Sequence, residues 1–171
     1  MTISMYQASV PVFLNMLDSL SHLLRKAEAH AAEKSMDPAT VITARLAPDM
    51  YPLSAQVQIA TDHAKGAPSR LAGRDAPKFE DNESTFAELQ ARIDKTRDYL
   101  KSFAPADIDG SEERPIVLKL RQGERTFTGA QYLLHFAMVN FYFHVTTAYA
   151  ILRNRGVALG KRDYLGTLEL I

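Results

Sequence analysis

The stretch HFAMVNFYFHVTTAYAILR, residues 135–153, decides the fold of this chain. Apolar and aromatic residues fill more than one of its faces at helical spacing, which is typical of a helix that is covered on both sides. His135, Asn140 and His144 interrupt the apolar run, so we interpret it as a buried helix of a soluble protein and not as a membrane span. The same three residues are the first candidates for a functional site.

Three further long helices are expected N-terminal to this stretch, because apolar residues recur along each at three- and four-residue steps. They cover residues 3–34, 53–71 and 83–103, and the last helix is expected over residues 129–155. Pro11 lies inside the first helix, so either a kink or a late start is predicted there.

A small β-hairpin is expected just before the last helix. PIVLKL and RTF flank the turn residues Gln122 and Gly123, and Thr128 with Gln131 three residues later matches a capping box. Two short strands are marginally stable alone, so the hairpin must lean on the helices. The loops between the first and second helices and between the third and fourth are long. The sequence therefore predicts an all-α four-helix bundle with crossover connections and this hairpin, as a single domain over residues 1–171.

Composition excludes several classes of function. The 171 residues include no cysteine, so disulfides, thiolate zinc sites and cysteine nucleophiles are excluded. Lys plus Arg and Asp plus Glu are 20 each, a balance that argues against nucleic-acid binding and against an anionic membrane as partner. We find no signal-peptide pattern and no run long enough to cross a membrane. A cytoplasmic protein is expected.

The two histidines of the opening stretch are not expected to share a metal. A helix advances about 100° and 1.5 Å per residue, so His135 and His144 lie about 180° apart around the axis and about 13 Å apart along it. Two ligands of one zinc ion keep their nitrogens within about 4 Å. Asn140 and His144, in contrast, lie one turn apart on the face expected to point into the bundle. An unpaired buried polar group costs about 1–3 kcal/mol, so both need a network, a water, a ligand or a metal.

The opposite face of the last helix is nearly as apolar, with Met138, Val139, Tyr142, Val145, Tyr149 and Leu152. One small bundle covers both faces of a helix only with difficulty. Two alternatives stay open: a homodimer contact through Tyr142, Tyr149 and their neighbours, or cover by the hairpin and the C-terminal tail, residues 157–171.

The third helix carries its charged residues beside the apolar stripe. They are Arg92, Lys95, Arg97, Asp98 and Lys101. Such a pattern usually marks a solvated face, so we expect all of them to point into water.

Several motifs along nearly the whole chain resemble a known group. They are SMYQASVPVF, RLAPDMYPL, FEDNE, NFYFHVTTAYAILRNRG and LGKRDYLG. The chain resembles the DinB/YfiT-like superfamily and, within it, a bacterial domain-of-unknown-function family. The resemblance implies a four-helix bundle, often dimeric, and it brings no assigned activity from the smaller family.

The wider superfamily implies a metal site. Many members bind a divalent metal through three histidines, one from the second helix and a His-x-x-x-His pair from the last, and some use it to activate thiols. The positions that correspond here are His63, Asn140 and His144. Asparagine offers a neutral amide oxygen, which is a poor ligand for zinc or nickel beside imidazole. The resemblance thus implies a degenerate site for zinc, nickel or manganese.

Two hypotheses about function follow. The first is a non-catalytic DinB-like bundle whose degenerate pocket binds a small-molecule ligand or merely persists. The alternative is a divalent-metal-dependent enzyme of the thiol transferase or hydrolase type, in which the metal polarises a water or a thiol. The enzyme hypothesis requires the side chains of His63 and His144 to converge in one pocket, because the sequence offers no other centre.

Overall fold

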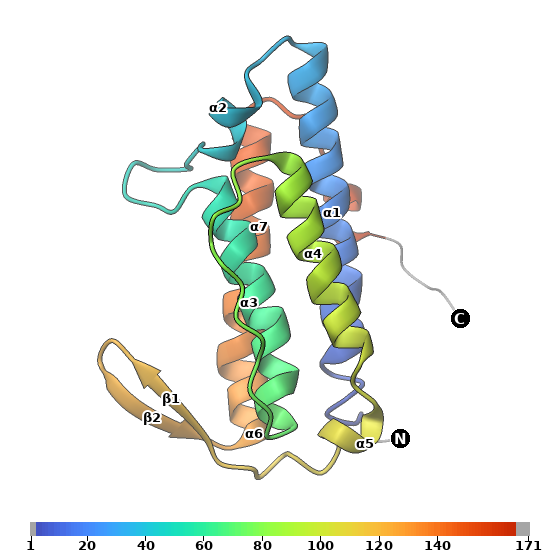
Figure 1. Ribbon diagram of the computed structural model, residues 1–171, viewed down its shortest axis with the longest axis vertical. Coiled ribbons are helices and arrows are strands. Elements are labelled where there is room, and N and C mark those ends of the chain that lie inside the picture. Colours follow the sequence, from blue (N-terminus) through green and yellow to red (C-terminus); the bar gives the residue numbers. More distant parts are fainter. Residues whose placement is uncertain (1–2, 167–171) are drawn as a thin grey trace.

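Four long helices lie side by side in the computed structural model, which describes residues 3–166 (Figure 1). They are α1 (Val10–Glu33), α3 (Leu53–Leu71), α4 (Phe86–Lys101) and α7 (Met138–Asn154). The short helices are α2 (Pro38–Ile42), α5 (Pro105–Ile108), α6 (Gly129–Gln131) and α8 (Lys161–Leu165). A hairpin of β1 (Ile116–Leu120) and β2 (Gly123–Phe127) precedes the last long helix. The predicted four-helix bundle with a small hairpin is confirmed.

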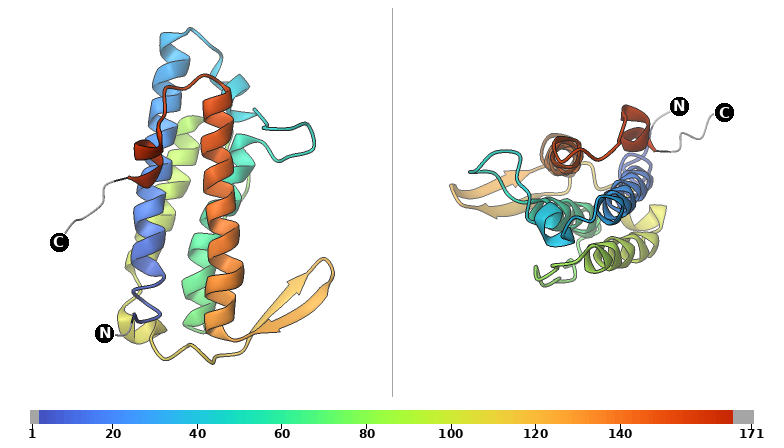
Figure 2. Two further views of the ribbon diagram at one scale, coloured as in Figure 1. Left: turned by 180° about the vertical axis from the view of Figure 1, so that it is seen from behind. Right: turned by 90° about the horizontal axis from the view of Figure 1, so that it is seen from above.

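The crossover connection lies elsewhere than expected. Residues 72–85 run back along the length of the bundle, so that α3 and α4 point in the same direction (Figure 1). The connections that contain α2 and α5 instead begin and finish at the same end of the bundle (Figure 1). Seen from above, α4 and α7 occupy opposite sides, with α1 and α3 between them (Figure 2). Loop length alone misled us, because a long loop can also hold a short helix and return to the same end.

The ends of the helices follow local capping chemistry. α1 begins at Val10, so that Pro11 lies in its first turn, where the missing N–H of proline costs no helical hydrogen bond. Of the two alternatives for this helix, the late start is the one that the structure shows. The capping box of Thr128 and Gln131 is confirmed, with hydrogen bonds of 3.1 and 3.3 Å between them.

α4 begins at Phe86, three residues later than the start expected from the sequence. Thr85 caps the helix in a capping box with Glu88. Both the threonine hydroxyl and the glutamate carboxylate find a backbone N–H in this arrangement, which satisfies two donors at once.

The last helix is interrupted near its start. Residues Tyr132–Ala137 form a π-helix between α6 and α7. A π-helical turn is wider than an α-helical turn, so it changes the face on which side chains emerge and makes the angle between His135 and His144 approximate. The two side chains still lie in different surroundings, because His135 is exposed and His144 is buried.

The core is built from the inward stripes of the four long helices. Phe13 of α1 and Phe141 of α7 meet edge to face, with ring centres 4.9 Å apart. Ile116 and Leu118 of β1 point into the protein, whereas Val117 between them is exposed. One face of β1 therefore leans on the helices, as two short strands require.

The outer face of α7 is covered in part by the chain itself. Tyr164 of α8 contacts Tyr149 with ring centres 5.8 Å apart, and its hydroxyl hydrogen-bonds to Thr146 (2.9 Å). Val139 and Phe143 remain 59% and 56% exposed. Residues 167–171 of the expected tail lie outside the described residues. The tail thus covers the outer face of α7 around Tyr149. Around Phe143 the face stays exposed, and there the homodimer contact stays a prediction.

Within residues 3–166, none of the helices has both the length and the apolar character that crossing a bilayer requires.

Candidate functional site

His63 of α3 and His144 of α7 face each other where these two helices pack. Their ring centres lie 6.1 Å apart, and their planes are within 16° of parallel. The sequence alone left open whether His63 points inward, because it lies at the edge of its apolar stripe. The structure brings the two rings into one place.

Gln56 determines which nitrogen of His144 carries the proton. Its amide Nε2 donates to the carbonyl oxygen of Tyr51 (3.0 Å), which turns Oε1 toward Nδ1 of His144 (2.7 Å). An amide oxygen only accepts, so Nδ1 must donate and Nε2 must hold the lone pair. His144 therefore satisfies its buried N–H inside the protein and keeps one accepting nitrogen.

Asn140 does not join the two histidines as an equal partner. Its amide Nδ2 donates to the backbone carbonyl of Phe136, one turn earlier (2.7 Å), which leaves Oδ1 as its only coordinating atom. Across residues 3–166 no cluster of three His, Cys, Asp or Glu side chains is placed to hold a metal. The donor set is thus two imidazoles and at most one neutral amide oxygen, which does not fit the three-histidine centre that the resemblance implies.

Both imidazoles are neutral at neutral pH. Burial lowers the pKa of His63 to about 4, and the charge of a protonated His144 would lower it further, against a smaller opposing effect of Asp62. Burial also lowers the pKa of His144. Each ring then has one N–H and one lone pair, so the pair can donate and accept hydrogen bonds without carrying a net charge.

A cavity of about 340 Å³ opens beside His63, between α3, β1 and the π-helix. Phe136 forms one wall, with its ring centre 6.0 Å from that of His63 and 6.1 Å from that of Tyr132. Arg70 also lines the cavity and donates from Nη1 to the Tyr132 hydroxyl (3.1 Å). The π-helix places both Tyr132 and Phe136 on this wall, and such distortions are frequent at functional sites. We call this space, with His63 and His144, the histidine pocket.

Arg92 was predicted to point into water, and that prediction is wrong. Its side chain is 1% exposed. Nε donates to the Thr61 hydroxyl (2.7 Å), Nη1 pairs with Glu83 (3.0 Å), and Nη2 pairs with Asp62 and Asp81 (2.9 Å each). We call these five residues the Arg92 network. The network holds the 72–85 crossover against the interface between α3 and α4. Because the Arg92 guanidinium is paired with carboxylates, its charge can be buried at this interface.

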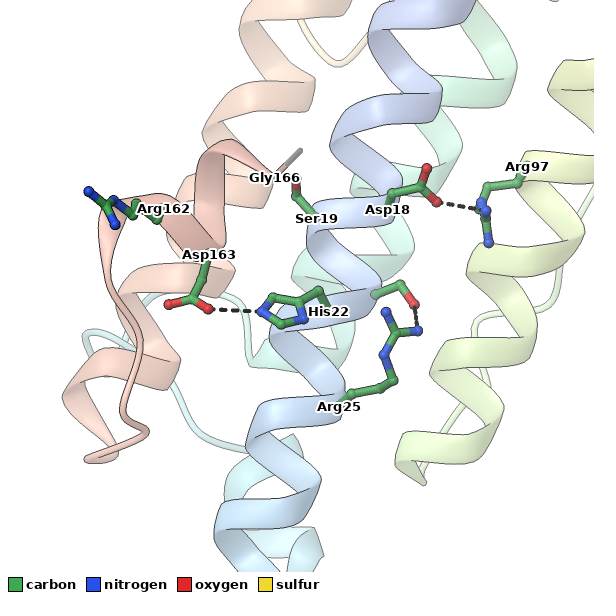
Figure 3. Close-up of a pocket in the computed structure, with 9 residues that line it drawn as sticks. Asp18, Ser19, His22, Arg25, Arg97, Arg162, Asp163 and Gly166 are labelled. Carbon is green, nitrogen blue, oxygen red and sulfur yellow. Dashed lines mark hydrogen bonds and ion pairs between the residues drawn. The ribbon is translucent and has the colours of Figure 1, made fainter. Parts of the chain in front are cut away.

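A larger cavity, of about 660 Å³, lies between α1, α4 and α8 (Figure 3). Most of its polar groups pair with one another: His22 with Asp163 (2.8 Å), Arg97 with Asp18 (2.7 Å) and Arg25 with the Ser21 hydroxyl (2.8 Å). The Arg162 side chain extends away from this group (Figure 3). The His22 and Asp18 pairs link α8 to α1 and α1 to α4. The cavity is therefore better explained as a polar interface between these helices than as a binding site.

The fold and the histidine pair define a DinB-like helical bundle. Residues 5–165 match the family model for the domain of unknown function DUF1993, and the chain belongs to that family. The chain is also similar to the crystal structure of a DinB family member protein from Shewanella denitrificans, with 41% sequence identity and a TM-score of 0.89. That match covers 97% of this chain and 94% of the other. No curated protein matches this chain. The resemblance drawn from the motifs is confirmed, and it brings no activity with it.

Two residues that contribute to this site were not predicted from the sequence. Gln56 and Arg70 stand seven residues before and seven residues after His63. Seven residues are nearly two helical turns, so all three side chains emerge on one face of α3. This spacing was the available signal, and it was hidden because Gln56 and Arg70 are polar residues in a stripe defined by apolar ones.

Proposed function

We propose that this chain is a non-catalytic DinB-like protein that binds a small molecule in the histidine pocket. The observation that carries the proposal is the state of His63. Its half-buried ring makes no hydrogen bond with any residue of the described range 3–166, yet it lines a cavity at the lower end of ligand size. The ring nitrogens of His63 are not among the buried unpaired atoms, so they are accessible from the cavity, where a ligand can form a hydrogen bond with them.

The walls of the pocket favour a ligand that is partly flat and apolar. Phe136 lies between His63 and Tyr132, and Phe127 of β2 contacts Phe136 with ring centres 5.8 Å apart. Aromatic walls bind planar groups through stacking and burial. His63 adds one neutral polar contact, which can be made to a donor or to an acceptor on the ligand.

Nuclear magnetic resonance of the full chain, labelled with ¹³C and ¹⁵N at histidine, tests this proposal. Aromatic fragments added one at a time are expected to shift the ring signals of His63 and His144 and to leave the exposed His135 unmoved. A His63→Phe variant, which fills the pocket, should lose the shift at His144. Fragments that shift no histidine ring, or that shift His135 equally, would contradict the proposal.

The alternative is a divalent-metal-dependent enzyme, and one observation favours it. His63 and His144 converge, and the hydrogen bond of Gln56 to Nδ1 of His144 leaves the Nε2 lone pair free to coordinate a metal. The test is the metal content of tag-free protein by mass spectrometry after addition of zinc, nickel or manganese. About one equivalent that is lost in His144→Ala would support the enzyme, and no metal in either protein would remove it.

A further inference from the structure

The histidine pocket contains a cation that the fold does not neutralise. Arg70 lines the cavity, and among the described residues no carboxylate pairs with it. The cavity also touches Asp62, but that carboxylate is already shared by Lys65 and Arg92. Lys119 of β1 adds a second positive charge to the lining. The pocket is therefore electropositive although the chain as a whole has no net charge.

Two features of the sequence hold Arg70 in this position. A Cβ at Gly66 would come within 2.5 Å of Nη1, so only glycine lets the guanidinium fold back over its own helix. There Nη1 donates to the Gly66 carbonyl (3.1 Å) and to the Tyr132 hydroxyl (3.1 Å). Both N–H groups of Nη1 are thus used by the protein.

The rest of the guanidinium is left for a ligand. Nε and Nη2 form no hydrogen bond within residues 3–166, and neither is among the buried unpaired nitrogens. These two nitrogens make one edge of the guanidinium fork, whose parallel N–H groups match the two oxygens of a carboxylate. A guanidinium with one edge held by the protein and one edge open is oriented before the ligand arrives, which lowers the entropic cost of binding.

We propose that the pocket binds a small carboxylic acid with an apolar, preferably aromatic, body. The carboxylate lies on the Nε–Nη2 edge of Arg70, and the body lies against Phe136 and the apolar side chains of β1. This inference rests on the proposed small-molecule function of the same pocket and names the class of ligand. A volume of about 340 Å³ lies at the lower end of the range for small-molecule sites, which suits a single-ring acid.

Calorimetric and NMR titrations of the full chain with phenylacetate, phenylacetamide and inorganic phosphate test the proposal. The amide has the shape of the acid without its charge, and phosphate has charge without an apolar body. Phenylacetate is expected to bind at least about ten times more tightly than either, because it alone makes both kinds of contact. Its binding should shift the ring signals of His63.

Three variants locate the effect. Arg70→Gln is expected to weaken phenylacetate binding at least about tenfold, because it removes the charged fork. Gly66→Ala keeps the charge but displaces Arg70, so it should weaken binding as well and serves if Arg70→Gln folds poorly. Arg125→Gln on the exposed strand β2 removes the same charge outside the cavity and should change nothing.

The outcomes separate this inference from the function on which it rests. Equal binding of acid and amide, or acid binding that survives in both Arg70→Gln and Gly66→Ala, would overturn the carboxylate inference and leave a small-molecule pocket. Phosphate binding as tight as phenylacetate would overturn it too, since a diffuse anion site explains that result. If no aromatic fragment shifts His63, both proposals fail.

Discussion

Asp62 and His63 are neighbours on α3, yet they belong to two regions built in opposite ways. Asp62 turns toward the Arg92 network, where every guanidinium nitrogen has a partner. His63 turns toward the cavity, where its ring contacts His144 and Phe136. A saturated buried network stabilises one arrangement of the chain, whereas an unpaired polar group beside a cavity is available for binding. Substitutions in the first region should therefore lower stability most, whereas substitutions at the unpaired groups of the second should cost less stability and should also lower binding.

Arg92→Met is expected to have the largest effect on stability. Removal of one partner from a buried ion pair costs about 3–5 kcal/mol. Asp62 and Asp81 are 41% and 58% exposed and can regain water, while Glu83 cannot, so we expect a loss near the lower end, about 3 kcal/mol. Urea denaturation measures it. The exposed pair of Lys101 and Asp98 provides the control, because Lys101→Ala should cost less than about 0.5 kcal/mol. Similar costs for both variants would contradict the comparison.

Acidification is expected to have the second largest effect, through His63. Its pKa is about 4 in the folded protein and about 6.5 in the unfolded chain, so the unfolded chain binds the proton more tightly between these values. The contribution of His63 to stability is complete above pH 6.5, is lost as the pH falls toward 4, and is constant below that. At about 1.4 kcal/mol per pKa unit, this difference corresponds to at most about 3.5 kcal/mol, and the partial solvent exposure of the ring reduces the expected loss to about 2–3 kcal/mol.

Stability curves at a series of pH values measure this effect. His63→Gln should flatten the curve between pH 6.5 and 4, because the titrating group is removed. The lowered pKa of His144 adds a loss of the same sign, so some slope remains. Curves of identical slope for the wild type and His63→Gln would show that His63 is not held neutral by burial.

Gln56→Leu is expected to cost less stability, about 1–2 kcal/mol, because it leaves Nδ1 of His144 and the Tyr51 carbonyl without partners. Its more specific effect is on the tautomer. ¹⁵N spectra should show Nδ1 of His144 protonated in the wild type and both tautomers populated in the variant. Gln90→Leu, which breaks hydrogen bonds to Ser21 at a different site, is the control and should leave His144 unchanged. The same tautomer mixture in all three proteins would exclude the role of Gln56.

Phe143→Asp is expected to have the smallest effect on folding, within about 0.5 kcal/mol, because the side chain is 56% exposed. It tests the homodimer, for which α7 offers its partly exposed outer face. Sedimentation should show a dimer for the wild type and a monomer for the variant. Ala91→Asp places the same charge on α4, on the opposite side of the bundle, and should stay dimeric (Figure 2). A monomeric wild type would rule out the predicted dimer.

Much of the fold was predictable because it depends on short-range patterns. The stripes of α1, α3, α4 and α7 follow from spacing, and the capping box at Thr128 follows from two residues three apart. The crossover between α3 and α4 was misplaced, because the direction of each helix depends on packing with the others. The π-helix was missed for a similar reason: Tyr132–Ala137 is an ordinary apolar segment, and nothing in its composition marks a wider turn.

The candidate site was predictable only in part. His63 and His144 were named from the resemblance, and their spacing along the chain says nothing about the 6.1 Å between their rings. Arg92 was placed in water because charged residues usually are. Its partners Asp62, Asp81 and Glu83 stand 9 to 30 residues away, and only the packed crossover collects them around it.

The sequence by itself determined the four helices, the hairpin, the family and the candidate histidines, because each depends on residues that are close along the chain or on motifs that can be compared. Only the tertiary structure decided which polar groups are satisfied. Gln56 accepts the N–H of His144, and the 72–85 crossover brings Glu83 to pair with Arg92. Within residues 3–166, His63 and the Nε–Nη2 edge of Arg70 have no hydrogen-bond partner, and both residues line one cavity. Burial and hydrogen bonding depend on distances between distant segments, and those distances exist only after the helices have packed.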